Sequence, residues 1–292
     1  MTSSEPSIPL GPRMDAQVVS EPGNALARVD GEWAGSCVVN DRGLMYGDGV
    51  FRTLRLRSGR PVWIEDQLER LAADARRLGI DPPRDALWQA DLAALAERMP
   101  DAAVRLSLTR GVSARGYLPA ADALPRRIAV ASPLPDESAG VDAHGIRMRV
   151  CELRLGWQPA LAGIKHLNRL ENVLARMEWR DPAIHEGVLL DTAGHVVSAV
   201  SGNLFILRAG ELVTPILDRC GVAGVARARL MRIAPTLGYP VREARFSLEE
   251  LLAADAVLVS NSLIRLRWVA ACGERRWSRP PAFDAWLEEM GV

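Results

Sequence analysis

Residues 163–174 read GIKHLNRLENVL, and the third of them, Lys165, is the only lysine in this chain of 292 residues. The chain has 36 lysines and arginines together, so all the others are arginines. An arginine stays protonated at any useful pH and cannot form an imine with a carbonyl compound, whereas a lysine can. The single lysine therefore indicates either covalent amine chemistry or a genome that has replaced lysine by arginine almost everywhere.

The residues around Lys165 favour covalent chemistry. Asn168 is a preferred helix N-cap, and Glu171 follows three residues later, as in a capping box. An apolar helical face is then expected from Leu170, Val173, Leu174 and Met177. Lys165 should therefore lie immediately before a helix. Its apolar neighbours Ile164 and Leu167 should lower its pKa by desolvation and so free the neutral, nucleophilic amine.

The composition excludes several classes of protein. Acidic and basic residues balance at 36 each, so no surface for a polyanion such as nucleic acid is expected. The cysteines form no CxxC pair and the histidines no HExxH motif, so neither a metal site nor a disulfide framework is predicted. Free thiols fit a reducing cytoplasm. We also expect no membrane span, because no apolar run approaches about 20 residues, and no signal peptide.

Changes in composition along the chain predict two domains. Residues 1–25 are rich in Ser, Pro and Gly and are expected to form a flexible extension. An N-terminal domain is expected over 26–132, and a linker over 133–140, where prolines and polar residues interrupt the pattern. Residues 141–292 then form the C-terminal domain.

Both domains mix helices with strands, which predicts an α/β (α+β) fold. Alternating and continuous apolar runs predict strands at 27–33, 50–56, 103–109, 128–131, 146–150, 188–191, 204–207 and 256–259. Helical spacing predicts helices at 65–78, 86–98 and 281–290. A glycine-rich turn at 218–227 opens a further helix. Free N–H groups at such a turn form a natural cradle for a phosphate.

Three blocks of sequence carry a family resemblance. They are GIKHLNRLENVLAR at 163–176, DRG through GDGVF at 41–51, and GVLLD through NLF at 187–205. In this order they resemble the fold-type IV pyridoxal-phosphate (PLP) enzymes, most closely the 4-amino-4-deoxychorismate lyases. The resemblance spans roughly residues 29–272. It implies a smaller N-terminal α/β domain, a larger C-terminal PLP-binding domain with a barrel-like sheet, a small-molecule substrate, and a homodimer with active sites near the interface.

The resemblance also implies roles for individual residues that bind the cofactor. Lys165 matches the lysine that carries PLP. Arg70 matches the phosphate-binding arginine, although its position off the apolar stripe of the helix at 65–78 would otherwise suggest a solvated charge. The remaining cofactor contacts are expected from Ser198, Asn203, the backbone of Val225 and Ala226, and Ser262.

Substrate binding is expected at the N-terminal domain. Phe51 falls on an aromatic position that lines the pocket, and its ring has no hydroxyl to offer. Arg115 lies in an Arg-Gly-Tyr sequence that resembles the lyases, and its guanidinium suits a carboxylate. Arg110 is the second candidate for this role. Both arginines could equally be exposed loop residues in so arginine-rich a chain.

One position departs from the family. Most members have a glutamate where this chain has Ser198, and that carboxylate keeps the pyridine nitrogen of PLP protonated, which strengthens the ring as an electron sink. No acidic residue lies between Asp191 and Glu211 that could take its place. A serine can only form a hydrogen bond there, so a neutral pyridine is expected.

The implied reaction is an elimination. Lys165 would form an imine with PLP, be displaced by the substrate amine, and then remove the proton from the amine-bearing ring carbon. Pyruvate would leave and the ring would aromatise to 4-aminobenzoate, a precursor of folate. An aminotransferase of D- or branched-chain amino acids would share the lysine, but it depends more on a protonated pyridine, so Ser198 favours the lyase. A non-catalytic PLP-fold binding protein is the remaining alternative, and it would be colourless.

Overall fold

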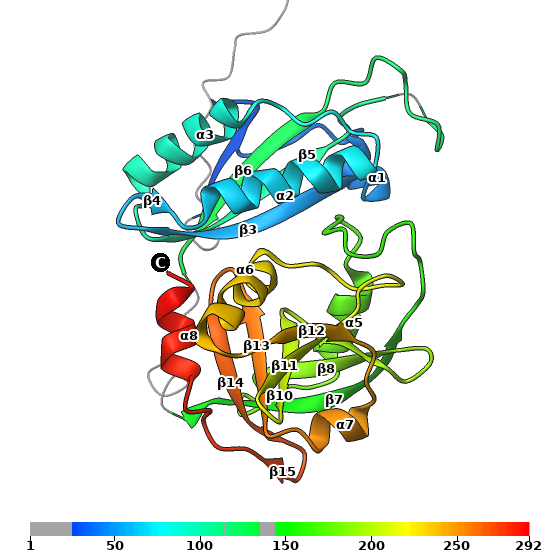
Figure 1. Ribbon diagram of the computed structural model, residues 1–292. Coiled ribbons are helices and arrows are strands. Elements are labelled where there is room, and N and C mark those ends of the chain that lie inside the picture. Colours follow the sequence, from blue (N-terminus) through cyan, green and yellow to red (C-terminus); the bar gives the residue numbers. More distant parts are fainter. Residues whose placement is uncertain (1–24, 114, 135–143, 292) are drawn as a thin grey trace, which may run out of the picture.

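The computed structural model describes residues 25–113, 115–134 and 144–291 (Figure 1). Most of the extension expected at 1–25, and most of the linker expected at 133–140, therefore lies outside the described residues. Two sheets lie on either side of this linker in the sequence, and Figure 1 shows them as two bodies that face each other. Among the described residues, no helix combines the length and apolar character needed to cross a membrane.

The first body is a six-stranded sheet with the order β2-β1-β6-β5-β3-β4, in which each pair of neighbours is antiparallel. Its strands are β1 (Leu26–Val29), β2 (Glu32–Trp33), β3 (Gly49–Arg57), β4 (Arg60–Pro61), β5 (Ala102–Thr109) and β6 (Arg126–Ser132). Its helices are α1 (Arg42–Tyr46), α2 (Ile64–Arg77) and α3 (Asp85–Arg98). Helices α2 and α3 pack on one face of the sheet and form a single core with the apolar side chains of β3, β5 and β6.

The second body is a nine-stranded mixed sheet with the order β12-β11-β10-β13-β14-β7-β8-β9, and β15 pairs with β14. Its strands are β7 (Ile146–Leu155), β8 (Glu186–Asp191), β9 (Val196–Ala199), β10 (Asn203–Arg208), β11 (Glu211–Pro215), β12 (Val241–Ala244), β13 (Ala256–Asn261), β14 (Arg265–Cys272) and β15 (Arg275–Arg276). Shifts of register at β14–β7, β7–β8 and β8–β9 bend the sheet. The sheet curls so far that β9 lies against β10 and β11.

Short helices cover the second sheet. They are α5 (Leu170–Met177), α6 (Val225–Ile233), the 3-10 helix η1 (Ala234–Leu237), α7 (Leu248–Leu252) and α8 (Phe283–Glu289). Helices α6 and α8 pack on a core that Phe205, Leu258 and Trp268 contribute from the strands. The capping box of α7 is formed by Ser247 and Glu250, whose side chains each bind the other's main-chain N–H group.

Two local predictions were wrong. The helix after Lys165 begins at Leu170, and its N-cap, Arg169, makes no side-chain capping bond. Asn168 and Glu171 form no capping box, because Asn168 donates to the carbonyl of Gly47 and Glu171 accepts from the amide of Gly156. The single strand expected at 27–33 is instead a hairpin, because the chain turns between β1 and β2 at residues 30 and 31, which have φ values of 51° and 96°.

The segment that contains Lys165 connects the two bodies. Lys165 accepts a main-chain hydrogen bond from Phe51 at 2.9 Å, and the amide of Leu167 donates to Gly49 at 2.9 Å. On the other side, Gly163 exchanges main-chain hydrogen bonds with the 221–223 loop, donating to Gly221 and accepting from Ala223 at 3.0 Å each. The lysine is therefore held at the boundary between the start of β3 and the loop that leads into α6.

Candidate active site

Lys165 is fixed by its main chain and by an aromatic ring. Its amide donates to Oδ2 of Asp74 on α2 at 2.9 Å, while its carbonyl accepts from Phe51 on β3. Its Nζ lies 4.5 Å from the centre of the Phe51 ring. Two elements of the first body thus determine where the amine points.

The surroundings of Lys165 favour the neutral amine. Burial, together with the positive charges of Arg52, Arg169 and Arg105, lowers the pKa of Lys165 from 10.5 to about 7, against the opposite effect of Asp74. A large share of Lys165 is therefore unprotonated at neutral pH and can act as a nucleophile or a base. Desolvation was expected from the flanking apolar residues; the three arginines come from distant parts of the sequence.

Lys165 opens into a cavity of about 760 Å³ between the two bodies. This is the size of a pocket for a small-molecule ligand or cofactor. Seven of the ten residues selected from the sequence line it, namely Phe51, Lys165, Ser198, Asn203, Val225, Ala226 and Ser262. The other three, Arg70, Arg110 and Arg115, are not among the described residues of its wall.

One end of the cavity is built around the start of α6. Gly224 is the N-cap of this helix and provides no side-chain cap, so the amides of Val225 and Ala226 are available to a ligand. Asn203 fixes the preceding loop, since its Oδ1 accepts from the amide of Gly224 at 3.1 Å and its Nδ2 donates to Val222 at 2.7 Å. Gly224 must be small, because a Cβ there would lie 2.3 Å from the Oδ1 of Asn203.

Further polar groups gather at the same end. Ser262 accepts a hydrogen bond from the Nε2 of Gln67 at 2.9 Å, which leaves its own proton free to donate. Ser260 also lines the cavity, and its hydroxyl is buried without a partner among the described residues. A Cβ at Gly163 would lie 3.8 Å from both a terminal nitrogen of Arg70 and the Cβ of Ala223. Arg70 therefore lies beside the loop that leads into α6, and these groups together fit a phosphate.

Ser198 lies on β9 opposite Leu189 and lines the cavity. Among the described residues of the cavity wall, only Glu171 carries a carboxylate, and its Oε1 accepts a hydrogen bond from the amide of Gly156. Ser198 thus faces the cavity with a hydroxyl, in a wall that has little negative charge near the position expected for a ring nitrogen.

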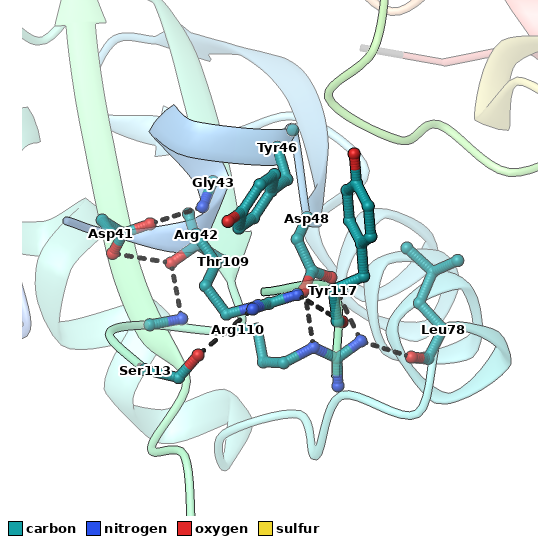
Figure 2. A network of polar contacts seen from close by, with 12 residues as sticks. Asp41, Arg42, Gly43, Tyr46, Asp48, Leu78, Thr109, Arg110, Ser113 and Tyr117 are labelled. Atoms are coloured by element: carbon teal, nitrogen blue, oxygen red, sulfur yellow. Dashed lines mark hydrogen bonds and ion pairs between the residues drawn. The ribbon is translucent and has the colours of Figure 1, made fainter. Parts of the chain in front are cut away.

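Arg110 lies in a separate network (Figure 2). Its Nε and one terminal nitrogen bind both oxygens of Asp48, at 2.8 and 3.1 Å, and its terminal nitrogens also donate to the carbonyls of Gly79 and Leu78. Asp48 in turn binds the Nε of Arg42 at 2.8 Å. These bonds occupy four of the five N–H donors of Arg110, so its guanidinium is committed to this network and not to a substrate carboxylate.

Arg115 is exposed on the loop that follows. Arg42 holds this loop on both sides of Arg115, because its guanidinium donates to Ser113 Oγ at 3.2 Å and to the carbonyls of Gly116 and Tyr117 at 2.9 Å each. Figure 2 shows Tyr117 beside Tyr46, and the centres of the two rings are 5.6 Å apart. Arg115 is therefore carried by an anchored, exposed loop and does not line the cavity.

Sequence reasoning missed several polar residues that line the cavity, above all Arg52, Arg105 and Arg169. Burial lowers the pKa of Arg105 and of Arg169. The Cζ of Arg105 lies 3.7 Å from the centre of the Phe51 ring. Along 103–109 Arg105 alternates with the apolar residues Val104 and Leu106, and its side of the strand faces the cavity. The alternation alone could not show this.

Comparisons with known proteins identify the family of the chain. The model of the family described as amino-transferase class IV matches residues 49–272. The aminodeoxychorismate lyase of Vibrio harveyi is 35% identical over 228 residues, which cover 77% of this chain and 83% of that protein. The D-alanine aminotransferase of Listeria monocytogenes serotype 4b is 29% identical over 78% of this chain and 79% of that protein. The crystal structure of 4-amino-4-deoxychorismate lyase from Pseudomonas aeruginosa has a TM-score of 0.86 and 43% identity, covering 91% of this chain and 98% of that one.

Proposed function

This chain belongs to the amino-transferase class IV family, and we propose that it is a lyase that converts 4-amino-4-deoxychorismate to 4-aminobenzoate and pyruvate. Its cofactor is pyridoxal 5'-phosphate. The observation that carries the proposal is the state of Lys165. The only lysine of the chain has a pKa of about 7 and lines the same cavity as the start of α6 and a group of arginines.

The residues at the start of α6 fit the phosphate of the cofactor. We assign its contacts to the amides of Val225 and Ala226, the hydroxyl of Ser262 and the guanidinium of Arg70. Asn203 supports them by holding Gly224 in place. When bound, the cofactor accepts the electron pair that a substrate leaves behind on losing a proton.

Lys165 has two tasks in the reaction. As a neutral amine it would hold the cofactor covalently, and once the substrate amine has freed it, it would remove the proton from the amine-bearing ring carbon. Because its pKa is about 7, the amine is free to accept this proton near neutral pH. Loss of the pyruvate portion then produces an aromatic ring, which supplies driving force.

The substrate has two carboxylates, and the arginines of the cavity suit them. We propose Arg105 and Arg169 for this role in addition to Arg115. Arg169 is oriented by His166, since its Nε donates to the carbonyl of His166 and its terminal nitrogen lies against the Nε2 of that ring. Burial and the charge of Arg169 lower the pKa of His166 to about 4, so the ring is neutral and accepts this bond.

A lyase explains Ser198 better than an aminotransferase does. Ser198 cannot hold a pyridine nitrogen protonated, and among the described residues of the wall the only carboxylate, that of Glu171, already accepts a bond from Gly156. An aminotransferase must return a proton to the cofactor and depends on strong delocalisation into the ring, whereas the lyase gains aromaticity. An aminotransferase of D- or branched-chain amino acids is the second candidate, favoured by the sequence similarity to D-alanine aminotransferase.

We also propose that the chain is a homodimer. The apolar face of α5 is exposed, with relative exposures from 50% for Val173 to 75% for Leu170. Leu44 and Met45 on α1, and Tyr117 and Leu118 on the Arg115 loop, are exposed as well. So much exposed apolar surface marks an interaction site. A second copy would cover it and could bring its Arg115 to the neighbouring cavity.

The four cysteines are free, as a reducing cytoplasm would leave them. We propose this compartment for the protein. Denatured protein prepared without reductant should react with four equivalents of a thiol reagent, and a lower number would argue for an oxidising compartment.

Product analysis tests the function. The protein should release pyruvate and 4-aminobenzoate in equal amounts from enzymatically made aminodeoxychorismate, and Lys165→Ala should abolish both. Borohydride should remove the visible absorbance of the protein and fix the cofactor on the peptide that contains Lys165. Release of neither product, with activity on D-alanine or branched-chain amino acids instead, would establish the aminotransferase. A colourless protein that pyridoxal phosphate cannot reconstitute would contradict both enzymes and favour a non-catalytic binding protein.

A further inference from the structure

A buried ion pair lies directly beside Lys165. Arg52 on β3 and Asp74 on α2 are 2% and 1% exposed, and a terminal nitrogen of Arg52 binds the Oδ2 of Asp74. Arg52 also lines the cavity. The side chain of Arg52 lies on the face of β3 that carries Val50, Leu54 and Leu56, so an arginine is placed here among core residues. Packing alone does not explain a charge in this position, because burying it is costly.

The carboxylate of Asp74 serves three groups at once. Its Oδ2 binds Arg52 and accepts the amide of Lys165 at 2.9 Å, and its Oδ1 lies 3.5 Å from the Nε of Arg70. The pair therefore connects β3, α2 and the main chain of the lysine. Arg52 remains protonated, since burial lowers its pKa only to about 10 while Asp74 opposes this effect.

We propose that Arg52 and Asp74 are positioning residues for Lys165. Asp74 fixes the main chain of the lysine, and Arg52 places a permanent positive charge in its surroundings, which disfavours protonation of the amine. The proposal concerns only the proton of Lys165, and it rests on the proposed function insofar as that function needs the neutral amine. A like charge at close range destabilises the protonated form of an amine.

Arg52 differs from the other charges that face the amine. Arg105 on β5 and Arg169 ahead of α5 act in the same direction, Asp74 acts against them, and His166 is neutral above a pKa of about 4. Substrate carboxylates bound to Arg105 and Arg169 would cancel their effect. Arg52 is already paired inside the protein, so its contribution is present with or without substrate.

The single lysine makes a direct measurement possible. In the full-length chain, freed of cofactor and grown with lysine labelled with ¹³C at Cε, Lys165 is the only labelled side chain and its resonance reports its own titration. Arg52→Met should raise the pKa of Lys165 by about 1 unit or more, because the amine loses the positive charge that acts on it most strongly. Arg52→Met should also slow the condensation of Lys165 with pyridoxal phosphate near neutral pH, because less of the amine is neutral in this variant.

The chain offers a matched control. Arg127 and Asp91 form a second buried ion pair between a strand and a helix of the same body, with exposures of 9% and 1%, and neither contributes to the charges that act on Lys165. Arg127→Met should therefore leave the Lys165 titration unchanged. Equal titrations in wild type and Arg52→Met, or an equal shift in Arg127→Met, would overturn the proposal.

Arg52→Met leaves the buried carboxylate of Asp74 with Arg70, at 3.5 Å, as its remaining cationic partner and could unfold the chain, so the double variant Arg52→Met/Asp74→Asn is the second measurement. It removes both charges, and it should show a smaller rise of the same sign, because Arg52 acts on Lys165 more strongly than Asp74 does. No rise in the double variant would also refute the proposal. None of these titrations uses a substrate, so a failed lyase assay with a shifted titration would contradict the proposed function alone.

Discussion

Replacing Lys165 by methionine should stabilise the cofactor-free protein at neutral pH. The pKa of Lys165 is 10.5 in an unfolded chain and about 7 in the folded one, so the unfolded chain binds more protons between these values. Stability therefore rises with pH across this window. Below pH 7 the folded protein must hold a charged amine in the cavity, and above pH 10.5 the amine is neutral in both states and the penalty disappears.

The size of the effect follows from the shift. At about 1.4 kcal/mol per pKa unit, the charged amine costs about 4 kcal/mol at pH 7 and about 2 kcal/mol at pH 9. These are upper limits, because Lys165 borders a cavity that admits water. Lys165→Met keeps the length and most of the volume of the side chain and removes only the charge, so packing against Phe51 is preserved.

Urea denaturation at pH 6, 7, 8, 9 and 10 measures the difference. The free energy of unfolding of Lys165→Met should exceed that of wild type by up to about 4 kcal/mol at pH 7, and this excess should shrink toward zero at pH 10. All other titrating groups are shared by the two proteins and cancel in the difference. If the free energy of unfolding of Lys165→Met equals that of wild type, or exceeds it by the same amount at every pH, Lys165 is fully solvated. The basis for its neutral form would then be removed.

Three further perturbations test other parts of the site. Ser198→Glu should raise transamination of D- or branched-chain amino acids, because a carboxylate at this place can keep the pyridine nitrogen protonated; assays that show no rise count against this assignment. Gly224→Ala should weaken pyridoxal-phosphate binding by about tenfold or more, since the new Cβ must displace Asn203, and a spectroscopic titration with unchanged affinity would contradict the cradle. Leu174→Glu should shift sedimentation from dimer to monomer, whereas Glu152→Gln, another exposed position, should not.

The local elements of the first body could be predicted closely from the sequence. The helix expected at 65–78 is observed as Ile64–Arg77, and the strand expected at 103–109 as Ala102–Thr109. In both segments the apolar residues lie on one face, so their periodicity is undisturbed, although Ser107 and Thr109 on the other face of β5 are buried as well. The capping box predicted from Asn168 and Glu171 was wrong. Their side chains bind residues elsewhere in the sequence, and only the folded chain brings those residues near.

The site could be predicted only in part, for the same reason. Lys165 and the glycine-rich turn before α6 have a local sequence signature. The pairing of Arg52 with Asp74 has none, because the two lie on different elements and meet beside Lys165 only in the folded protein. The apolar face of α5 was expected and is present, but its exposure depends on the packing of α5 on β7 and β8, which periodicity does not determine.

The pairing of β7 has a consequence for how the chain is made. Ile146 at the start of β7 pairs with Val269 of β14, so the ribosome must reach residue 269 before β7 gains its neighbour on that side. Until then the connection from β7 to β8, which contains Lys165, joins two strands of an incomplete sheet. Early termination near residue 260 should therefore yield insoluble fragments with an unformed lysine pocket.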